Sequence, residues 1–182
     1  MTTMRLGGAA EIESLLRKLP EKVAKKVVVS SLRQGGNVIA KQAKVNLASH
    51  GSVVTGALAG AVKTITVRNP TQGAAQVKVG IVGKKVSVIR PGETKPRNIG
   101  PGTYAKWVEF GTGEHQIQPK SAEYLEFNVG GRSMFGRVVW HPGAKAKPFI
   151  RPAVDTKGAA AAQKVVAAAA KGIAREAGKL AG

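Results

Sequence analysis

The chain contains no cysteine, and only ten of its 182 residues are acidic. Without cysteine, neither a disulfide framework nor a thiolate metal site can form, so packing or association between subunits must stabilise the fold. The absence of cysteine also makes the cytoplasm the default compartment. A chain of this length fits one domain with a moderate core, and we expect a single domain over residues 1–182.

Long apolar runs are absent as well. No stretch approaches the ~18 consecutive apolar residues that a membrane span requires. The first residues also lack the charged start and the apolar segment of a secretory signal. We therefore expect a soluble protein with no membrane partner.

Residues that could carry catalysis or bind a metal are scarce. The chain has three histidines and a single aspartate, Asp155, which lies near the expected start of a helix, where the dipole favours a carboxylate. His115 and His141 could join Glu109 or Glu114 as metal ligands, but the close spacings typical of metal motifs are missing. We predict no catalytic residue, no cofactor and no metal site.

Charge of one sign dominates instead. The chain has 29 Lys and Arg residues and a formal net charge of +19, which indicates a polyanion, an acidic protein surface or a crowded assembly as its surroundings. Aromatic residues make up only 4%, and none is interleaved with basic residues as base stacking requires, so we expect no sequence-specific reading of nucleic acid. Non-specific contact with DNA phosphates stays open.

The apolar spacing predicts two N-terminal helices. Residues 12–19 place four aliphatic side chains on one helical face, and Pro20 should end that helix. A second helix should run from Glu21 to about Ala48. Gly35-Gly36 weakens it, so either it kinks there or another backbone packs closely against it; we favour close packing.

The middle of the chain has the alternation of strands. Residues 62–67 and 75–83 predict an antiparallel hairpin around a turn at residues 68–73. Further strands are expected at 104–110, and at 124–129 and 135–140 on either side of Gly130-Gly131. We expect these strands to form a central antiparallel sheet.

A basic loop rich in Pro and Gly is expected at about residues 84–102, because three prolines prevent a long regular element there. Its cations are candidates for contact with DNA or with an acidic partner: Lys84, Lys85, Arg90, Lys95 and Arg97.

The C-terminal region predicts an alanine-rich helix from Ala153 to about Ala177. Its flat face suits packing on the sheet or on a neighbouring subunit, and the alternative is an exposed helix that frays at its end. The fold class is therefore α+β, with N-terminal helices, a central antiparallel sheet and a C-terminal helix.

Three separated segments carry a family resemblance. Residues 104–112 match a "YA-x-x-VEFGT" pattern, residues 55–58 match "TG-x-L", and "HPG" at 141–143 is followed by "PF-x-x-PA" at 148–153. In these segments the chain resembles the small neck or tail-completion proteins of long-tailed bacteriophages. The resemblance covers most of the chain, from about Glu11 to the last helix.

The resemblance implies a structural virion protein of the phage neck or tail. It would act as a ring of six subunits that joins or completes the tail at the head–tail interface, in a tail-completion or tail-terminator role and without an enzymatic step. Its partners would be adjacent head-closure, tail-terminator or tail-tube proteins, with non-specific contact to genomic DNA possible. The residues expected to contact subunits or partners are Tyr104, Trp107, Glu109, Phe110, Thr55, Leu58, His141 and Phe149.

Two other interpretations remain open. The charge alone also fits a basic protein that binds DNA or RNA non-specifically and forms no ring. A small hydrolase acting near the baseplate or cell wall would need Glu109 or His141 for activity. In the structural interpretation, Glu109 lies on a strand and pairs with a basic group.

Overall fold

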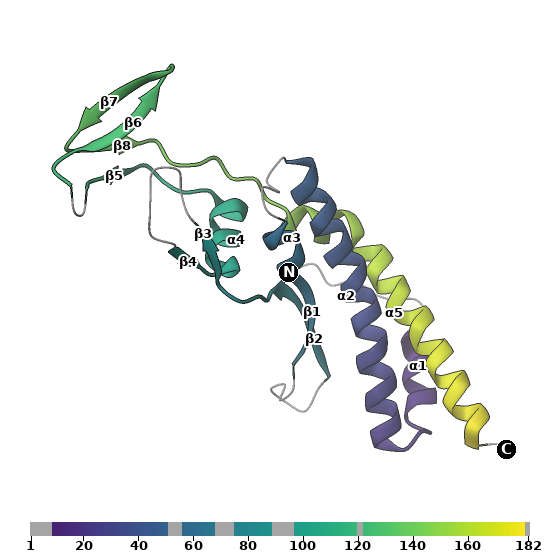
Figure 1. Ribbon diagram of the computed structural model, residues 1–182. Helices are drawn as coiled ribbons and strands as arrows, with labels where there is room; N and C mark the ends of the chain where they lie inside the picture. The colour runs from purple at the N-terminus through teal and green to yellow at the C-terminus, as the bar shows by residue number, and fades with distance from the viewer. Residues whose placement is uncertain (1–8, 51–55, 68–74, 89–96, 120–121, 181–182) are drawn as a thin grey trace.

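The computed structural model describes residues 9–50, 56–67, 75–88, 97–119 and 122–180. Two long helices dominate it, α2 (Glu21–Ser49) and α5 (Ile150–Leu180), and they lie side by side along their lengths (Figure 1). The short helix α1 (Ala9–Leu16) packs against α5. Helix α1 ends before Pro20 and α2 begins directly after it, so the two predicted N-terminal helices are confirmed.

Small residues let α2 and α5 approach closely. A Cβ added at Gly35 would collide with the Val165 side chain and lie 2.8 Å from the carbonyl oxygen of Ala161, and one at Gly172 would lie 2.8 Å from Cγ1 of Val27. Helix α2 continues unbroken through Gly35-Gly36. The expectation of close packing there is confirmed.

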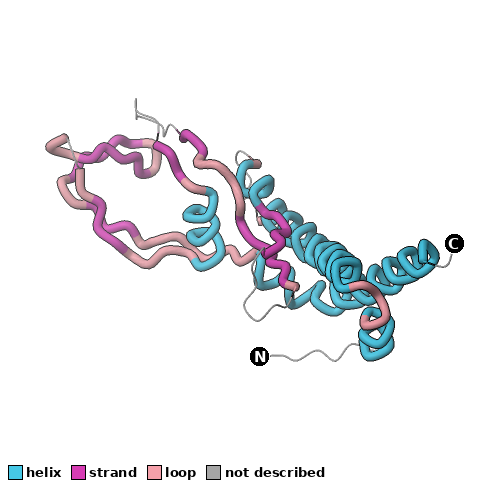
Figure 2. Tube along the Cα trace, turned by 90° about the horizontal axis from the view of Figure 1, so that it is seen from below, coloured by secondary structure: helices cyan, strands magenta, loops and turns pink. Residues whose placement is uncertain are grey.

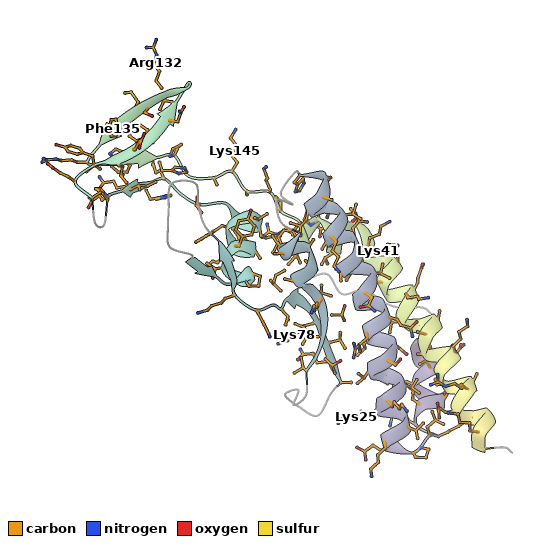
Figure 3. All side chains as sticks on the ribbon, viewed as in Figure 1. Lys25, Lys41, Lys78, Arg132, Phe135 and Lys145 are labelled. Atoms are coloured by element: carbon orange, nitrogen blue, oxygen red, sulfur yellow. The ribbon has the colours of Figure 1, made fainter. Side chains whose placement is uncertain are left out.

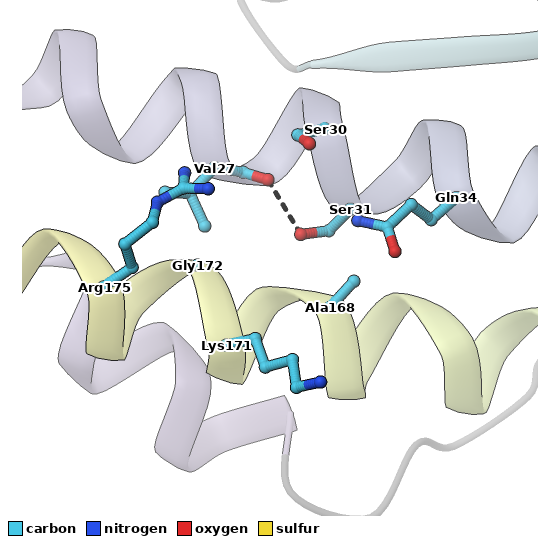
Figure 4. Close-up of a pocket in the computed structure, with 8 residues that line it drawn as sticks. All are labelled: Val27, Ser30, Ser31, Gln34, Ala168, Lys171, Gly172 and Arg175. Atoms are coloured by element: carbon cyan, nitrogen blue, oxygen red, sulfur yellow. Dashed lines mark hydrogen bonds between the residues drawn. The ribbon is translucent and has the colours of Figure 1, made fainter.

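A shallow pocket of about 350 Å³ lies along the contact between α2 and α5 (Figure 4). The buried hydroxyl of Ser31 donates to the carbonyl oxygen of Val27 at 2.8 Å, so this polar group is satisfied within its own helix. Arg175 at one end of the pocket donates to the Glu176 carboxylate next to it at 3.0 Å. The pocket is therefore a seam between two helices, and two of its polar groups, Ser31 and Arg175, already have partners.

The core lies where α2, the first turn of α5 and the short helix α3 (Ala57–Ala61) meet. Phe149 and Leu47 are its largest fully buried side chains. The remaining members are small or branched, which suits the close packing of the helices: Ala40, Ala43, Leu58, Val62, Ala105 and Ala153.

Strands β1 (Val62–Val67) and β2 (Gln76–Ile81) form an antiparallel pair beside α2, with Val62 opposite Ile81. The predicted strand pair is confirmed, and the turn predicted at residues 68–73 lies outside the described residues. The expected basic loop contains a short antiparallel pair, β3 (Val86–Val88) with β4 (Arg97–Ile99).

Residues 113–143, which we call the arm, extend away from the helices (Figures 1 and 2). Strand β5 (His115–Ile117) pairs with β8 (Val139–His141), and β6 (Leu125–Val129) pairs with β7 (Arg132–Gly136). Gly130 and Gly131 have φ values of 58° and 85°, as the tight turn between two strands requires. The predicted turn is confirmed. The single strand predicted at 135–140 is wrong, because residues 135–136 end β7 and residues 139–140 belong to β8, which pairs with β5.

The α+β class with N-terminal helices and a long C-terminal helix is confirmed. The strands, however, form four separate two-stranded antiparallel sheets within the described residues, where one central sheet was expected. Helix α5 has α2 as its main packing partner, because the small residues of both helices allow close contact. No described helix is long and apolar enough to cross a membrane.

The predicted strand at 104–110 is wrong, because these residues form helix α4 (Pro101–Phe110). Pro101 stands in its first turn, where a missing N–H costs nothing. Ala105 and Glu109, four residues apart, form the buried face, and Gly111 with φ 72° ends the helix. These helix signals outweigh the strand propensity of the aromatic and branched residues between them.

Candidate functional site

The carboxylate of Glu109 caps the start of α5. Glu109 is buried, and its Oε2 accepts hydrogen bonds from the backbone N–H groups of Phe149 at 2.7 Å and Ile150 at 2.9 Å. Its Oε1 accepts from the N–H of Arg151 at 3.1 Å. Pro152 follows and has no N–H, so one side chain satisfies all the free donors before the helical ladder begins.

The expectation that Glu109 pairs with a basic group is therefore wrong. A helix N-terminus attracts a carboxylate through its free N–H groups and its dipole, and it does so without a charged side chain. The expectation for Asp155 is wrong too, because α5 begins at Ile150 and the exposed Asp155 lies beyond its first turn. The cap comes from a residue 40 positions earlier in the chain.

Backbone hydrogen bonds fasten the end of α4 to the segment before α5. The N–H of Lys147 donates to the carbonyl oxygen of Val108 at 2.8 Å, and the N–H of Thr112 donates to that of Ala144 at 3.0 Å. The N–H of Ala144 returns a bond to Oγ1 of Thr112 at 2.9 Å. Together with the Glu109 cap, these bonds make one junction of residues 108–112 and 144–151, which we call the motif junction.

Two glycines are required by the close approach of these chains. Gly111 has φ 72°, and an added Cβ would lie 2.8 Å from the backbone nitrogen of Ala146. Gly143 has φ 85°, and a Cβ there would collide with the carbonyl groups of Thr112 and Gly113. The glycines of the "VEFGT" and "HPG" segments thus serve the same contact from its two sides.

One residue of the "TG-x-L" segment, Leu58, packs with the motif junction in the core. Leu58 on α3 and Phe149 at the start of α5 belong to one buried cluster. The amide of Asn46 on α2 donates to the carbonyl oxygen of Phe149 at 3.0 Å. Sequence reasoning missed Asn46, because its position on a helical face gave no sign of a partner 103 residues away. Thr55 lies outside the described residues.

The other candidate contact residues lie on the surface. Tyr104, Trp107 and Phe110 are exposed on α4, and the guanidinium of Arg151 lies 5.9 Å from the centre of the Phe110 ring. His141 is half-buried, and its ring centre lies 5.0 Å from that of His115 across the β5–β8 pair.

The basic candidates are placed only in part. Lys84 and Lys85 are exposed just before β3, and Arg97 begins β4. Arg90 and Lys95 lie outside the described residues. The chemistry of the motif junction itself is structural, since its one carboxylate is occupied by backbone donors. In the described part of the chain, no group of three or more His, Asp and Glu side chains could hold a metal ion.

One protein family matches this chain. Its description is "Bacteriophage HK97-gp10, putative tail-component", and its profile matches residues 10–111. The chain belongs to this family. The matched range ends at Gly111, which directly follows the helix that carries Glu109. Neither the curated proteins nor the solved structures that were searched gave a match.

Membership confirms the resemblance to phage tail proteins. The protein is a structural component of a bacteriophage tail, and its place is in the virion. A tail component works in contact with other phage structural proteins. The "HPG" and "PF-x-x-PA" segments lie beyond the matched range, and the structure joins them to "VEFGT" through the Glu109 cap and the two glycines.

Proposed function

We propose that the protein forms a homo-oligomeric ring that joins or completes the tail at the head–tail interface, as a tail-completion or tail-terminator component with six copies. The observation that carries this proposal is the arm, whose large apolar side chains lie exposed. Phe135 is 67% exposed, Trp140 65% and Val129 59%.

Such a surface is costly for a protein that works alone. Two-stranded sheets are marginally stable in water unless their apolar side chains pack against something. Contiguous exposed apolar side chains mark contact sites between proteins. The arm therefore needs a partner, and a neighbouring subunit in a ring supplies one.

The distribution of charge supports contact between identical copies through the arm. Residues 113–143 contain three Lys or Arg and three Glu, so the arm is net neutral, while the other residues carry the whole charge of +19. Copies that approached through their basic surfaces would repel one another. Contact through the neutral arm avoids this repulsion.

The candidate contact residues divide into two groups in this proposal. Tyr104, Trp107, Phe110 and His141 are accessible and can face a neighbouring subunit or tail protein. The others are buried within the chain and hold the fold that presents them: Glu109, Leu58 and Phe149.

The adjacent partners are head-closure, tail-terminator or tail-tube proteins, and the basic surface meets acidic partner surfaces or the genome. The expected basic contacts are Lys84, Lys85, Arg90, Lys95 and Arg97. A ring of such basic subunits needs compensating negative charge, which either DNA phosphates or acidic proteins can provide.

The test is a phage that lacks this gene and receives the protein in trans. Electron microscopy should show unjoined or incomplete tails without the protein and complete particles with it. Native mass spectrometry in moderate salt should show a closed oligomer of six. A monomer that binds duplex DNA tightly and has no affinity for phage connector or tail proteins would favour the basic nucleic-acid-binding alternative.

A further inference from the structure

One edge of β1 has no strand beside it among the described residues, because β1 pairs only with β2. The N–H of Val82 donates to the carbonyl oxygen of Ala61 at 2.7 Å, which fixes the phase of the ladder. Alternate residues of an antiparallel pair point their N–H and C=O groups away from the partner strand. In this register the outward set belongs to Val62, Thr64 and Thr66. The N–H of the buried Val62 already donates to the carbonyl oxygen of Leu58, so the N–H groups that remain for a new strand, within the described residues, are those of Thr64 and Thr66.

A groove runs along this open edge. It consists of two adjoining hollows of about 410 and 560 Å³ that share Arg33, Lys63 and Thr64. Side chains of a strand alternate between its two faces. The two hollows together are lined by the consecutive residues 62–66, which belong to both faces of β1, so the groove follows the edge of the strand. Helix α2 forms the opposite wall through Val29, Arg33 and neighbouring residues.

The lining of the groove combines positive charge with apolar surface. Four cations line it, and none of them forms an ion pair within the described residues. No carboxylate belongs to the lining as far as the described part of the chain shows it. The apolar residues Val29, Ile65 and Val82 lie among the cations. The four cations are Arg33, Lys41, Lys44 and Lys63.

We infer that this groove binds an extended, acidic segment of another protein, which adds a third strand to the open edge of β1. Main-chain pairing supplies affinity in such strand addition, and the flanking side chains select the sequence. The cations of Arg33 and Lys63 select acidic residues, and the apolar wall selects the apolar residues that alternate with them.

Two other occupants fit less well. DNA phosphates could meet the cations, but they would use neither the strand edge nor the apolar wall. A second copy of this chain is a poor source of an acidic strand, because the chain has only ten acidic residues. The inference rests on the edge and its charges and does not depend on the proposed ring.

The test uses a fluorescent peptide of alternating valine and glutamate, with a control peptide of equal charge in which proline replaces two valines. Fluorescence anisotropy should show binding of the first peptide and much weaker binding of the second, because proline lacks the N–H needed for strand pairing. Hydrogen exchange on the unmodified protein should slow at the amides of Thr64 and Thr66.

Charge variants test the role of the groove. Lys63→Glu should weaken binding roughly tenfold, since it reverses a charge beside the peptide. Lys164→Glu, an exposed position on α5 with the same change of net charge, should leave the Kd within a factor of about two.

Three results would overturn the inference. The first is an absence of peptide binding, or binding without slower exchange at the amides of Thr64 and Thr66. The second is equal weakening by Lys63→Glu and Lys164→Glu, which would reveal attraction to net charge alone. The third is protection of the same amides by a short duplex DNA and not by the peptide.

Discussion

In the helical pair of α2 and α5, the contact is built mainly from glycine, alanine and short aliphatic side chains, and two cations, Lys171 and Arg175, line a pocket along it. In the arm, the apolar side chains are large, several lie exposed, and the charges cancel. Figure 3 shows the contrast, with Lys25 and Lys41 on α2 and with Phe135 and Arg132 on the arm. Four of the eight aromatic residues of the chain lie within residues 113–143.

This difference separates the contacts that stabilise a single subunit from the apolar surface that remains for contact with another subunit. The helical pair and the core are complete within a single chain, since close backbone contact and the buried Phe149 leave little apolar surface open there. The arm is incomplete within a single chain, because its two-stranded sheets have little apolar packing of their own. The motif junction connects the two regions, as it fastens both ends of the arm to α4 and α5.

The largest effect is expected at the motif junction. Glu109→Ala should lower the free energy of unfolding by about 4 kcal/mol, because it leaves three backbone donors without an acceptor. Glu109→Gln keeps one acceptor oxygen and should lose about half as much. Chemical denaturation measures both. Glu114→Ala, at an exposed position, serves as the control and should stay near the parent; equal stability of Glu109→Ala would contradict the capping role.

A smaller loss is expected in the helical pair. Gly35→Val should lower the free energy of unfolding by about 3 kcal/mol, since its side chain would press against Ala161 and Val165 of α5. Gly60→Ala is the matched control, because nothing lies within 4 Å of an added Cβ and alanine favours helix α3. Thermal unfolding should rank the control at or above the parent. An unchanged Tm for Gly35→Val would show that the helices are not in close contact there.

Changes in the arm should leave folding nearly intact and remove assembly. Phe135→Ser combined with Trp140→Ser should change the free energy of unfolding of the isolated subunit by less than about 1 kcal/mol, because both side chains are exposed. The same variant should sediment as a monomer in moderate salt. Val45→Ser, an exposed apolar position on α2, should still assemble. Loss of assembly in both variants would remove the special role of the arm.

The smallest effect concerns the exposed end of α5. Arg175 and Lys179 donate hydrogen bonds to the Glu176 carboxylate, and these bonds hold its pKa below the ordinary value, with the bond from Arg175 as the larger cause. A carboxyl with a lowered pKa adds stability above its unfolded pKa and loses that contribution as the pH falls through the folded pKa. Glu176→Gln should therefore be slightly less stable at neutral pH and equal to the parent in acid. A difference that persists in acid would assign the effect to packing.

The helices and the first hairpin could be predicted from the sequence because their periodicity is strong and local. The close approach at Gly35-Gly36 was predictable for the same reason, as two glycines inside an apolar helical pattern need a neighbour. The prediction of a strand at residues 104–110 was wrong because seven residues span too few helical turns for the apolar spacing to distinguish a helix from a strand. The signals that indicate a helix are Pro101 at its start and Gly111 at its end. The partner of Glu109 could not be predicted, since three backbone N–H groups at the start of α5 leave no pattern in the sequence.

The division between a complete helical pair and an incomplete arm is tested most directly by hydrogen–deuterium exchange at two protein concentrations. In concentrated protein, where subunits assemble, amides of residues 113–143 should exchange more slowly than in dilute protein, and amides within α2 and α5 should not change. Slower exchange confined to α2 and α5, with an unchanged arm, would contradict the account.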